Sequence, residues 1–190
     1  MNLNYHLILA SKSPRRQDLL KSLGLEFEIR TKDVDESFPE DMEAMLVAQY
    51  LAEKKSAAFG ELAEQELLIT SDTTVVLGST ILNKPADKEE AMAMLEALSG
   101  GAHEVVTGVC LRSADKTVAF SETSEVHFRE LTVAEIEHYV DHYKPMDKAG
   151  AYGIQEWIGM IGIEKIVGDY YNVMGLPCQQ LYGQLTENFS

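Results

Sequence analysis

The chain has 190 residues, with 16 Lys and Arg against 31 Asp and Glu, and so carries a formal net charge of −15. An acidic protein of this kind lacks the basic surface that supplies most of the affinity for DNA or RNA, so we expect no nucleic-acid partner. No stretch is long and apolar enough to span a bilayer, and the first residues lack the basic start of a secretion signal, so we expect no membrane association and a cytoplasmic location. Cys110 and Cys178 lie far apart without metal-like spacing, and both are expected to be core residues in a reducing compartment.

The first predicted elements are a strand, a loop and a helix. The apolar run over residues 5–10 predicts the strand, and the helix is expected to begin at Pro14 and to end near Gly24. Ser13 suits the N-cap position, and proline suits the first helical position because its missing N–H would be unpaired there.

This helix start resembles an anion site in its chemistry. Free backbone amides and the helix macrodipole attract phosphate, Arg15 or Arg16 can form paired hydrogen bonds with phosphate oxygens, and Ser11 and Ser13 can donate further ones. The alternative is an ordinary capped helix with a solvated basic face. Any anion bound by so acidic a protein is expected to be small, and the abundant carboxylates make a divalent metal a plausible helper.

The middle of the chain predicts a long helix and then two β segments. A polar connector with several acidic residues leads into a helix over about residues 42–63. A buried strand over 67–70 is expected to break at the polar segment 71–74, before a second β run at 75–77. The residues expected on the inner face of the long helix are Leu46, Val47, Tyr50, Leu51 and Ala58.

The second half predicts further alternation of helices and strands, so the fold class is α/β with a mixed sheet. The expected elements are a helix capped by Asp87, strands over 104–111 and 118–128, a helix opened by Thr132 and Glu135, a β-rich stretch over about 154–173, and a last helix after Pro177. In the second of these strands, Ser124, Val126 and Phe128 are expected to point inward.

Several common catalytic motifs are absent from the sequence. There is no P-loop, no dinucleotide-binding glycine motif, no zincin motif and no hydrolase elbow. His138 and His142 are four residues apart on a predicted helix, but a solvated helix edge explains them better than a metal site.

Two charged residues near predicted strand ends stand out. Asp72 directly follows an apolar strand, so its carboxylate is expected at a strand end, where open α/β sheets place ligands. The alternative is a turn residue that caps the strand. Lys84 precedes Pro85, which favours extended backbone and fixes the direction of the ammonium group.

Taken together, the motifs resemble those of the Maf family of nucleoside triphosphate pyrophosphatases, in the family's order, from residue 7 to residue 177. They are Ala10-Ser11-x-Ser13-Pro14-Arg15-Arg16, Asp35-Glu36-Ser37, Leu51-Ala52-x-x-Lys55, Ser71-Asp72-Thr73, Ile81-Leu82-x-Lys84-Pro85, Leu98-Ser99-Gly100, Asp147-Lys148-Ala149-Gly150-Ala151-Tyr152-Gly153-Ile154-Gln155 and Gly175-Leu176-Pro177. The resemblance implies a mixed, bent sheet with flanking helices around a central cleft, as in inosine triphosphate pyrophosphatase. We expect one such domain over residues 1–190, with two lobes as an option.

The resemblance also implies an activity. The expected reaction cleaves nucleoside triphosphates between the α and β phosphates, gives a nucleoside monophosphate and pyrophosphate, requires Mg²⁺ or Mn²⁺, and serves a house-cleaning role in nucleotide metabolism. Many members form homodimers, so a homodimer is the expected assembly.

Roles for the matching residues follow from this chemistry. Asp72 is expected to be the general base and, with Glu36, a metal ligand. Lys55, Lys84 and Arg15 are expected to neutralise the triphosphate and the departing pyrophosphate. The hydroxyls of Ser11 and Ser13 are expected to bind phosphate.

Gln155 resembles the branch of the family that acts on dTTP and UTP. A neutral amide can accept from the ring N3–H of uracil or thymine and donate to a ring carbonyl, whereas cytosine offers no N3–H. The family pattern also links Arg15 and Thr73 to the choice of base. A 7-methyl-GTP pyrophosphatase is the nearer alternative, but an acidic residue is expected there. A non-catalytic nucleotide-binding regulator of septum formation is the more distant one.

The sequence departs from the family pattern directly after Gln155, where Glu156-Trp157 replaces an expected glycine-led turn. Trp157 is expected either to cover the base pocket or, more typically for so large a side chain, to pack against the sheet. The changed turn leaves modified uridine triphosphates open as substrates.

Overall fold

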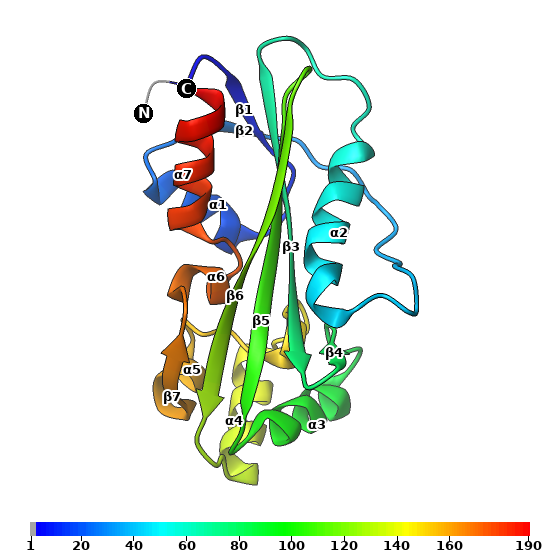
Figure 1. Ribbon diagram of the computed structural model, residues 1–190. Coiled ribbons are helices and arrows are strands. Elements are labelled where there is room, and N and C mark those ends of the chain that lie inside the picture. Colours follow the sequence, from blue (N-terminus) through cyan, green and yellow to red (C-terminus); the bar gives the residue numbers. More distant parts are fainter. Residues whose placement is uncertain (1–2) are drawn as a thin grey trace. The chain divides into compact units, whose positions relative to one another are not determined.

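One mixed sheet organises the chain, and the computed structural model describes it over residues 3–190 (Figure 1). The seven strands follow the order β2-β1-β3-β5-β6-β7, with β4 beside β3. Strand β1 runs parallel to β2 and β3, whereas the β3–β4 and β6–β7 pairs are antiparallel. The expected α/β class with a mixed sheet and flanking helices is therefore confirmed.

The elements have the following bounds. The strands are β1 (His6–Leu9), β2 (Phe27–Ile29), β3 (Glu66–Leu77), β4 (Thr80–Leu82), β5 (Ala102–Arg112), β6 (Thr117–Phe128) and β7 (Ile163–Val167). The helices are α1 (Pro14–Ser22), α2 (Ala44–Ala57), α3 (Lys88–Leu98), α4 (Val133–Tyr143), the single turn η1 (Ala149–Ala151), α5 (Trp157–Gly162), α6 (Tyr170–Met174) and α7 (Cys178–Phe189).

The chain divides into two compact units. The first takes in the chain up to Asp72, then Thr107–Glu122 and Gly175–Ser190, and the second takes in Thr73–Val106 and Thr123–Met174. Each is described by itself below.

The core of the first unit depends on a close approach of α2 to the sheet. Figure 1 shows α2 running alongside β3, and the Thr70 hydroxyl donates to the Ala52 carbonyl at 2.7 Å. On β5, a Cβ added at Gly108 would lie 2.3 Å from the backbone N of Gln49 and 2.4 Å from the carbonyl carbon of Ala48. Only glycine leaves room for the helix at this point.

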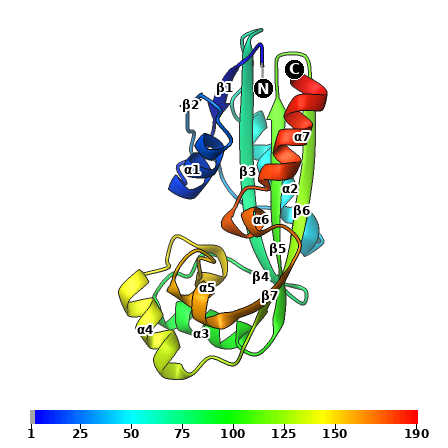
Figure 2. The same ribbon diagram turned by 90° about the vertical axis from the view of Figure 1, so that its left-hand side faces the viewer.

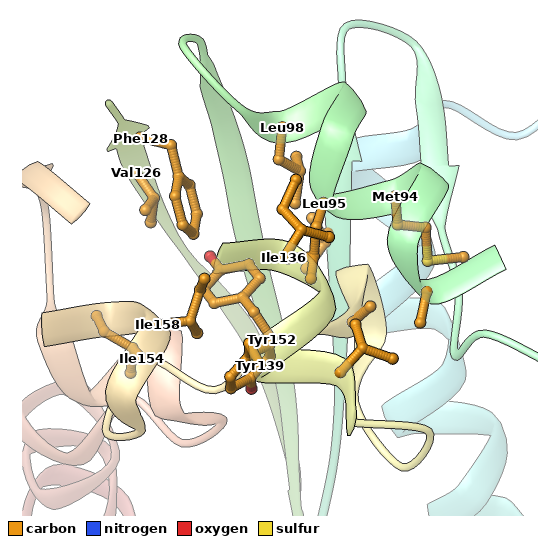
Figure 3. Close-up of a cluster of buried hydrophobic side chains, with 14 of the residues drawn as sticks. Met94, Leu95, Leu98, Val126, Phe128, Ile136, Tyr139, Tyr152, Ile154 and Ile158 are labelled. Atoms are coloured by element: carbon orange, nitrogen blue, oxygen red, sulfur yellow. The ribbon is translucent and has the colours of Figure 1, made fainter. Parts of the chain in front are cut away.

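The core of the second unit is a cluster of apolar side chains from β3, β5, β6 and the nearby helices. Figure 2 shows α3, α4 and α5 gathered together, and α3 contacts both α4 and η1. Helix α4 begins with a capping box of Thr132 and Glu135, and Asp87 caps α3, as predicted. The labelled members in Figure 3 are Met94, Leu95, Leu98, Val126, Phe128, Ile136, Tyr139, Tyr152, Ile154 and Ile158.

Most predicted elements are confirmed, but the long helix is shorter than expected. It covers Ala44–Ala57 rather than about 42–63, because Gly60 adopts a left-handed φ of 66° shortly after the last turn. Leu46, expected on its inner face, is 56% exposed. The inward positions of β6 are confirmed, since Ser124, Val126 and Phe128 are all buried.

The expected β-rich stretch over about 154–173 is wrong for most of its length. Only Ile163–Val167 forms a strand, while α5 and α6 occupy the flanks. Gly159 permits the tight turn of α5, because a Cβ there would lie 1.9 Å from the Ile154 carbonyl oxygen. At α6, the Asp169 carboxylate accepts from the Tyr171 N–H at 2.8 Å and so stabilises the helix start.

Three smaller expectations can be checked over residues 3–190. In that range, no helix combines the length and the apolar character needed to cross a membrane. Cys110 and Cys178 are both buried thiols, as predicted. His138 and His142 are exposed on α4, and no group of three or more His, Cys, Asp or Glu side chains in the described chain could hold a metal ion.

We predict that Gly108→Ala destabilises the protein by about 3 kcal/mol, because the new methyl group meets backbone atoms of α2 that cannot move alone. Gly183→Ala in α7 is the control, since nothing lies within 4 Å of its added Cβ. That change should stabilise the helix by about 0.5–1 kcal/mol. Denaturant unfolding measures both, and equal effects would contradict the close-approach argument.

We also predict a pH dependence of stability from His103. Burial, helped by the charge of His127, lowers the pKa of His103 from 6.5 to about 4. The unfolded chain therefore takes up this proton first, and the free energy of unfolding falls by about 3 kcal/mol as the pH drops from about 6.5 to about 4. Unfolding measured between pH 7 and pH 4.5 should show a flatter profile in His103→Gln; parallel profiles would contradict the assignment.

Candidate active site

The loop between β1 and α1 forms the first part of the site. Ser13 is the N-cap of α1, as predicted, and its hydroxyl oxygen accepts from the Arg16 N–H at 3.5 Å. The Ser13 N–H in turn donates to the hydroxyl oxygen of Ser11, which is buried. Both hydroxyls act as acceptors in these contacts, so each keeps a proton that could be donated to a phosphate oxygen.

Arg16 is an anchor of this loop rather than an open phosphate ligand. Its Nε donates to the Gly175 carbonyl at 2.8 Å and its Nη1 to the Ser71 carbonyl at 3.0 Å. Pairing of β1 with β3 ends at Ile69, so Arg16 supplies a donor just beyond the end of that ladder. Burial lowers the pKa of Arg16, and the negative charge of Asp72 opposes this. Of the two arginines considered, Arg15 remains the predicted phosphate ligand.

Lys55 lies at the centre of a charged cluster. Its Nζ is 2.5 Å from Oδ1 of Asp72 and 2.7 Å from Oε1 of Glu36. The Lys55 and Asp72 side chains are only 17% and 13% exposed, whereas Glu36 is half exposed. The structure thus brings together three of the predicted site residues, and two carboxylates converge on one cation.

Two hydrogen-bonding groups of the sheet position Lys55. Thr70 lies two residues before Asp72 on β3, so both side chains share the face that α2 covers. From β5, Arg112 donates to the Ser56 carbonyl at 2.8 Å and to the Ser56 hydroxyl at 3.0 Å, which fixes the last turn of α2. The sheet therefore holds α2 at Ala52, before Lys55, and at Ser56, after it, and these contacts keep Lys55 over Asp72.

Glu36 belongs to the connector before α2, and Lys54 fastens that connector. The Lys54 ammonium donates to the Ser37 carbonyl at 2.7 Å and lies 3.3 Å from Asp35. Hydrogen bonds from Ser37 and Lys54 lower the pKa of Asp35. Consecutive lysines of α2 thus hold consecutive acidic residues. The sequence prediction missed Lys54, because the partners of its ammonium lie 17 and 19 residues away and are brought near it only by the fold.

The expected place of Asp72 at a strand end is wrong. Strand β3 continues from Glu66 to Leu77, and Asp72 lies inside it, so the turn-cap alternative is also excluded. The segment 71–74 contains no glycine or proline, and its two threonines favour extended backbone. Thr73 follows on the opposite face of the strand from Asp72.

The other predicted residues lie in the second unit. Lys84 is exposed in the segment between β4 and α3, where Pro85 is buried and the Asn83 carbonyl accepts from the Gly150 N–H at 3.3 Å. Gln155 is exposed in the turn before α5. Trp157 opens α5, and its ring lies 4.9 Å from that of His138 on α4. It also packs against the buried apolar cluster of the second unit, which contains side chains of the sheet.

Comparison with known proteins identifies relatives over nearly the whole chain. Residues 6–188 match the family described as Maf-like protein. The dTTP/UTP pyrophosphatase of Parabacteroides distasonis is 52% identical over 183 residues, covering 95% of each chain, and that of Bacteroides thetaiotaomicron is 49% identical with the same coverage. Among solved structures, a HAM1 protein from Coxiella burnetii gives a TM-score of 0.48 at 16% identity, covering 96% of this chain and 99% of that one.

Proposed function

The chain belongs to the Maf-like protein family, and on that basis we propose that it is a nucleoside triphosphate pyrophosphatase that prefers dTTP and UTP. It cleaves the substrate between the α and β phosphates and releases a nucleoside monophosphate and pyrophosphate. The structural observation that carries this proposal is the contact of Lys55 with Asp72 and Glu36. Binding alone would not need two carboxylates beside the polyanion, whereas hydrolysis needs a base.

In the proposed reaction, a water oxygen bonds to the α phosphorus while the bond from that phosphorus to the α–β bridging oxygen breaks. The bridging oxygen leaves with pyrophosphate, and the water gives one proton to Asp72. Oδ1 of Asp72 accepts a hydrogen bond from the Lys55 ammonium at 2.5 Å, which leaves Oδ2 as the other oxygen of the carboxylate. Oδ2 is therefore the oxygen proposed to accept the proton.

The cationic and hydroxyl groups offset the negative charge of the triphosphate. Lys55 and Arg15 in the first unit are proposed to neutralise phosphate oxygens, with Ser11, Ser13 and the free amides of α1 as hydrogen-bond donors. Lys84 of the second unit is proposed for the same task from the sequence pattern. Stabilising the charge that develops on the leaving group is the main demand of phosphoryl transfer.

Glu36 and Asp72 suit Mg²⁺ or Mn²⁺ as ligands. Their carboxylates already converge on one cation, the Lys55 ammonium, and two carboxylates with substrate phosphates are the usual ligands of Mg²⁺. When bound, such an ion would add positive charge at the phosphates and raise the acidity of water.

The choice of base is assigned to Gln155, with Arg15 and Thr73 as further proposed contributors. A neutral amide pairs with uracil or thymine as donor and acceptor, which favours dTTP and UTP over the alternative of 7-methyl-GTP. A cytoplasmic location, one domain over the whole chain and a homodimer are proposed from the sequence.

The test is a substrate panel. The purified protein is incubated with Mg²⁺ or Mn²⁺ and dTTP, UTP, CTP, GTP or 7-methyl-GTP, and pyrophosphate and monophosphate are measured. We expect preferential cleavage of dTTP and UTP, abolished by EDTA. Preference for 7-methyl-GTP would overturn the assignment of Gln155 to uracil and thymine. Binding of nucleotides without cleavage would favour the alternative of a non-catalytic nucleotide-binding regulator.

We predict that Asp72→Asn lowers kcat for UTP at least about 100-fold, because an amide cannot take up the proton from water. The variant should still bind UTP in a calorimetric titration, since the phosphate donors are intact. Asp18→Asn, an exposed change on α1, should leave kcat within two-fold of wild type. Unchanged turnover in Asp72→Asn would remove Asp72 as the base.

We predict that Lys54→Met raises the Mg²⁺ concentration for half-maximal activity about ten-fold, because the connector that carries Glu36 loses its anchor. At saturating Mg²⁺ the kcat should recover. Lys21→Met, an exposed change on α1, is the matched control and should leave the Mg²⁺ dependence unchanged. A fall in kcat at every Mg²⁺ concentration would contradict a role through the metal ligand.

A further inference from the structure

The residue that departs from the family pattern, Glu156, lies in a largely buried charged network of the second unit. The Nζ of Lys148 is 2.8 Å from Oδ1 of Asp147 and 3.1 Å from Oε1 of Glu156. The Lys148 side chain is only 8% exposed and that of Glu156 only 19%. A lysine buried to this degree needs a paired carboxylate, so Lys148 fixes where the Glu156 carboxylate lies.

Tyr139 of α4 fixes the other oxygen of the same carboxylate. The Tyr139 hydroxyl donates to Oε2 of Glu156 and accepts from the Gly153 N–H at 3.0 Å. Burial and the charge of Glu156 raise the pKa of Tyr139, so the hydroxyl keeps its proton for this contact. In Figure 3, Tyr139 belongs to the same buried cluster as Ile154, which follows Gly153 in the turn.

Gly153 brings the Glu156 carboxylate and the Gln155 amide to one place. A Cβ added at Gly153 would lie 2.9 Å from Cδ of Glu156 and 3.0 Å from Nε2 of Gln155. The side chains of Gln155 and Glu156 therefore both lie against Gly153, in the space that a larger residue at this position would occupy. A negative charge there attracts the amide nitrogen of Gln155 and repels the amide oxygen.

We propose that Glu156 is a specificity-determining positioning residue that orients the Gln155 amide, with its nitrogen toward the carboxylate and its oxygen toward the base. This rests on the proposed function, because it assumes that Gln155 contacts the base. An oxygen held in this direction accepts the N3–H of uracil or thymine. Cytosine presents an acceptor at N3, so the two acceptors would repel each other.

The orientation matters because an unrestrained amide can rotate. A glutamine whose amide is free to turn could donate from its nitrogen to N3 of cytosine and so serve either pyrimidine. The fixed charge of Glu156 penalises that rotated state. Removal of the charge should therefore improve the poor substrate, an effect that general damage to the fold does not produce.

The experiment compares kcat/KM for UTP and CTP in the full-length protein with Mg²⁺. Glu156→Gln keeps the size of the side chain and removes its charge, and we expect the UTP-to-CTP ratio to fall about ten-fold, mainly because CTP is cleaved faster. Tyr139→Phe should lower the ratio less, since Lys148 still holds the carboxylate. Glu96→Gln, an exposed change on α3, is the matched control and should leave the ratio unchanged.

Both kcat/KM values in the UTP-to-CTP ratio are measured on the same preparation. A smaller folded fraction lowers both equally and leaves the ratio unchanged. If Glu156→Gln fails to fold, the double variant Lys148→Met, Glu156→Gln removes the buried lysine that has lost one of its two carboxylate partners. The UTP-to-CTP ratio of this double variant, together with that of Tyr139→Phe, then decides. A wild-type preference for UTP that is unchanged in the folded variants overturns the inference and leaves the proposed function standing. Wild-type cleavage of UTP and CTP at equal efficiency also overturns the inference, and no cleavage of any nucleotide overturns the proposed function with it.

Discussion

The distance between α2 and the sheet is the constraint on which the first unit depends. Gly108 on β5 has no side chain that would collide with the backbone of α2, and the Thr70 hydroxyl joins the helix to β3. Because α2 is rigid, this contact sets the position of Lys55 relative to Asp72 and that of Lys54 relative to the connector. Helix packing in the core therefore determines the spacing of charges on the surface.

Each unit contains a lysine between two acidic side chains, but the two clusters differ in exposure. Lys55 contacts Asp72 and Glu36, and Glu36 is half exposed, so solvent and small ligands can reach this cluster. Lys148 contacts Asp147 and Glu156 and is almost fully buried. In a buried pair, the loss of one partner leaves an uncompensated charge, which favours a single fixed geometry. The cluster around Lys55, which is open to solvent at Glu36, suits chemistry, and the buried cluster around Lys148 suits positioning.

Helix starts could be predicted because the capping residues lie next to them in the sequence. The course of β3 and the partners of the lysines depend on long-range contacts, which a single sequence does not reveal. Ser13, Asp87 and Thr132 cap helices within three residues of themselves, and all three were predictable from spacing. Asp72 was misplaced because a polar segment resembles a turn, whereas sheet pairing over the whole of β3 decided its backbone. The roles of Lys54 and Lys148 were missed because Ser37, Asp35 and Glu156 become their partners only through tertiary contacts. The sequence motifs identified the family correctly. The capping residues predicted where helices begin, but they gave no information about function.

The location of Asp72 inside β3 also bears on how the protein can be controlled. Many enzymes carry their reactive group on a loop, so local opening can withdraw it at little cost. Here the carboxylate projects from a twelve-residue strand whose neighbours in the sheet are β5 and, up to Ile69, β1. Displacing it would require separating strands of the core, which costs a large part of the global stability. Disordering Asp72 would therefore disturb the sheet, whereas a change in the half-exposed connector that carries Glu36 would leave the sheet intact.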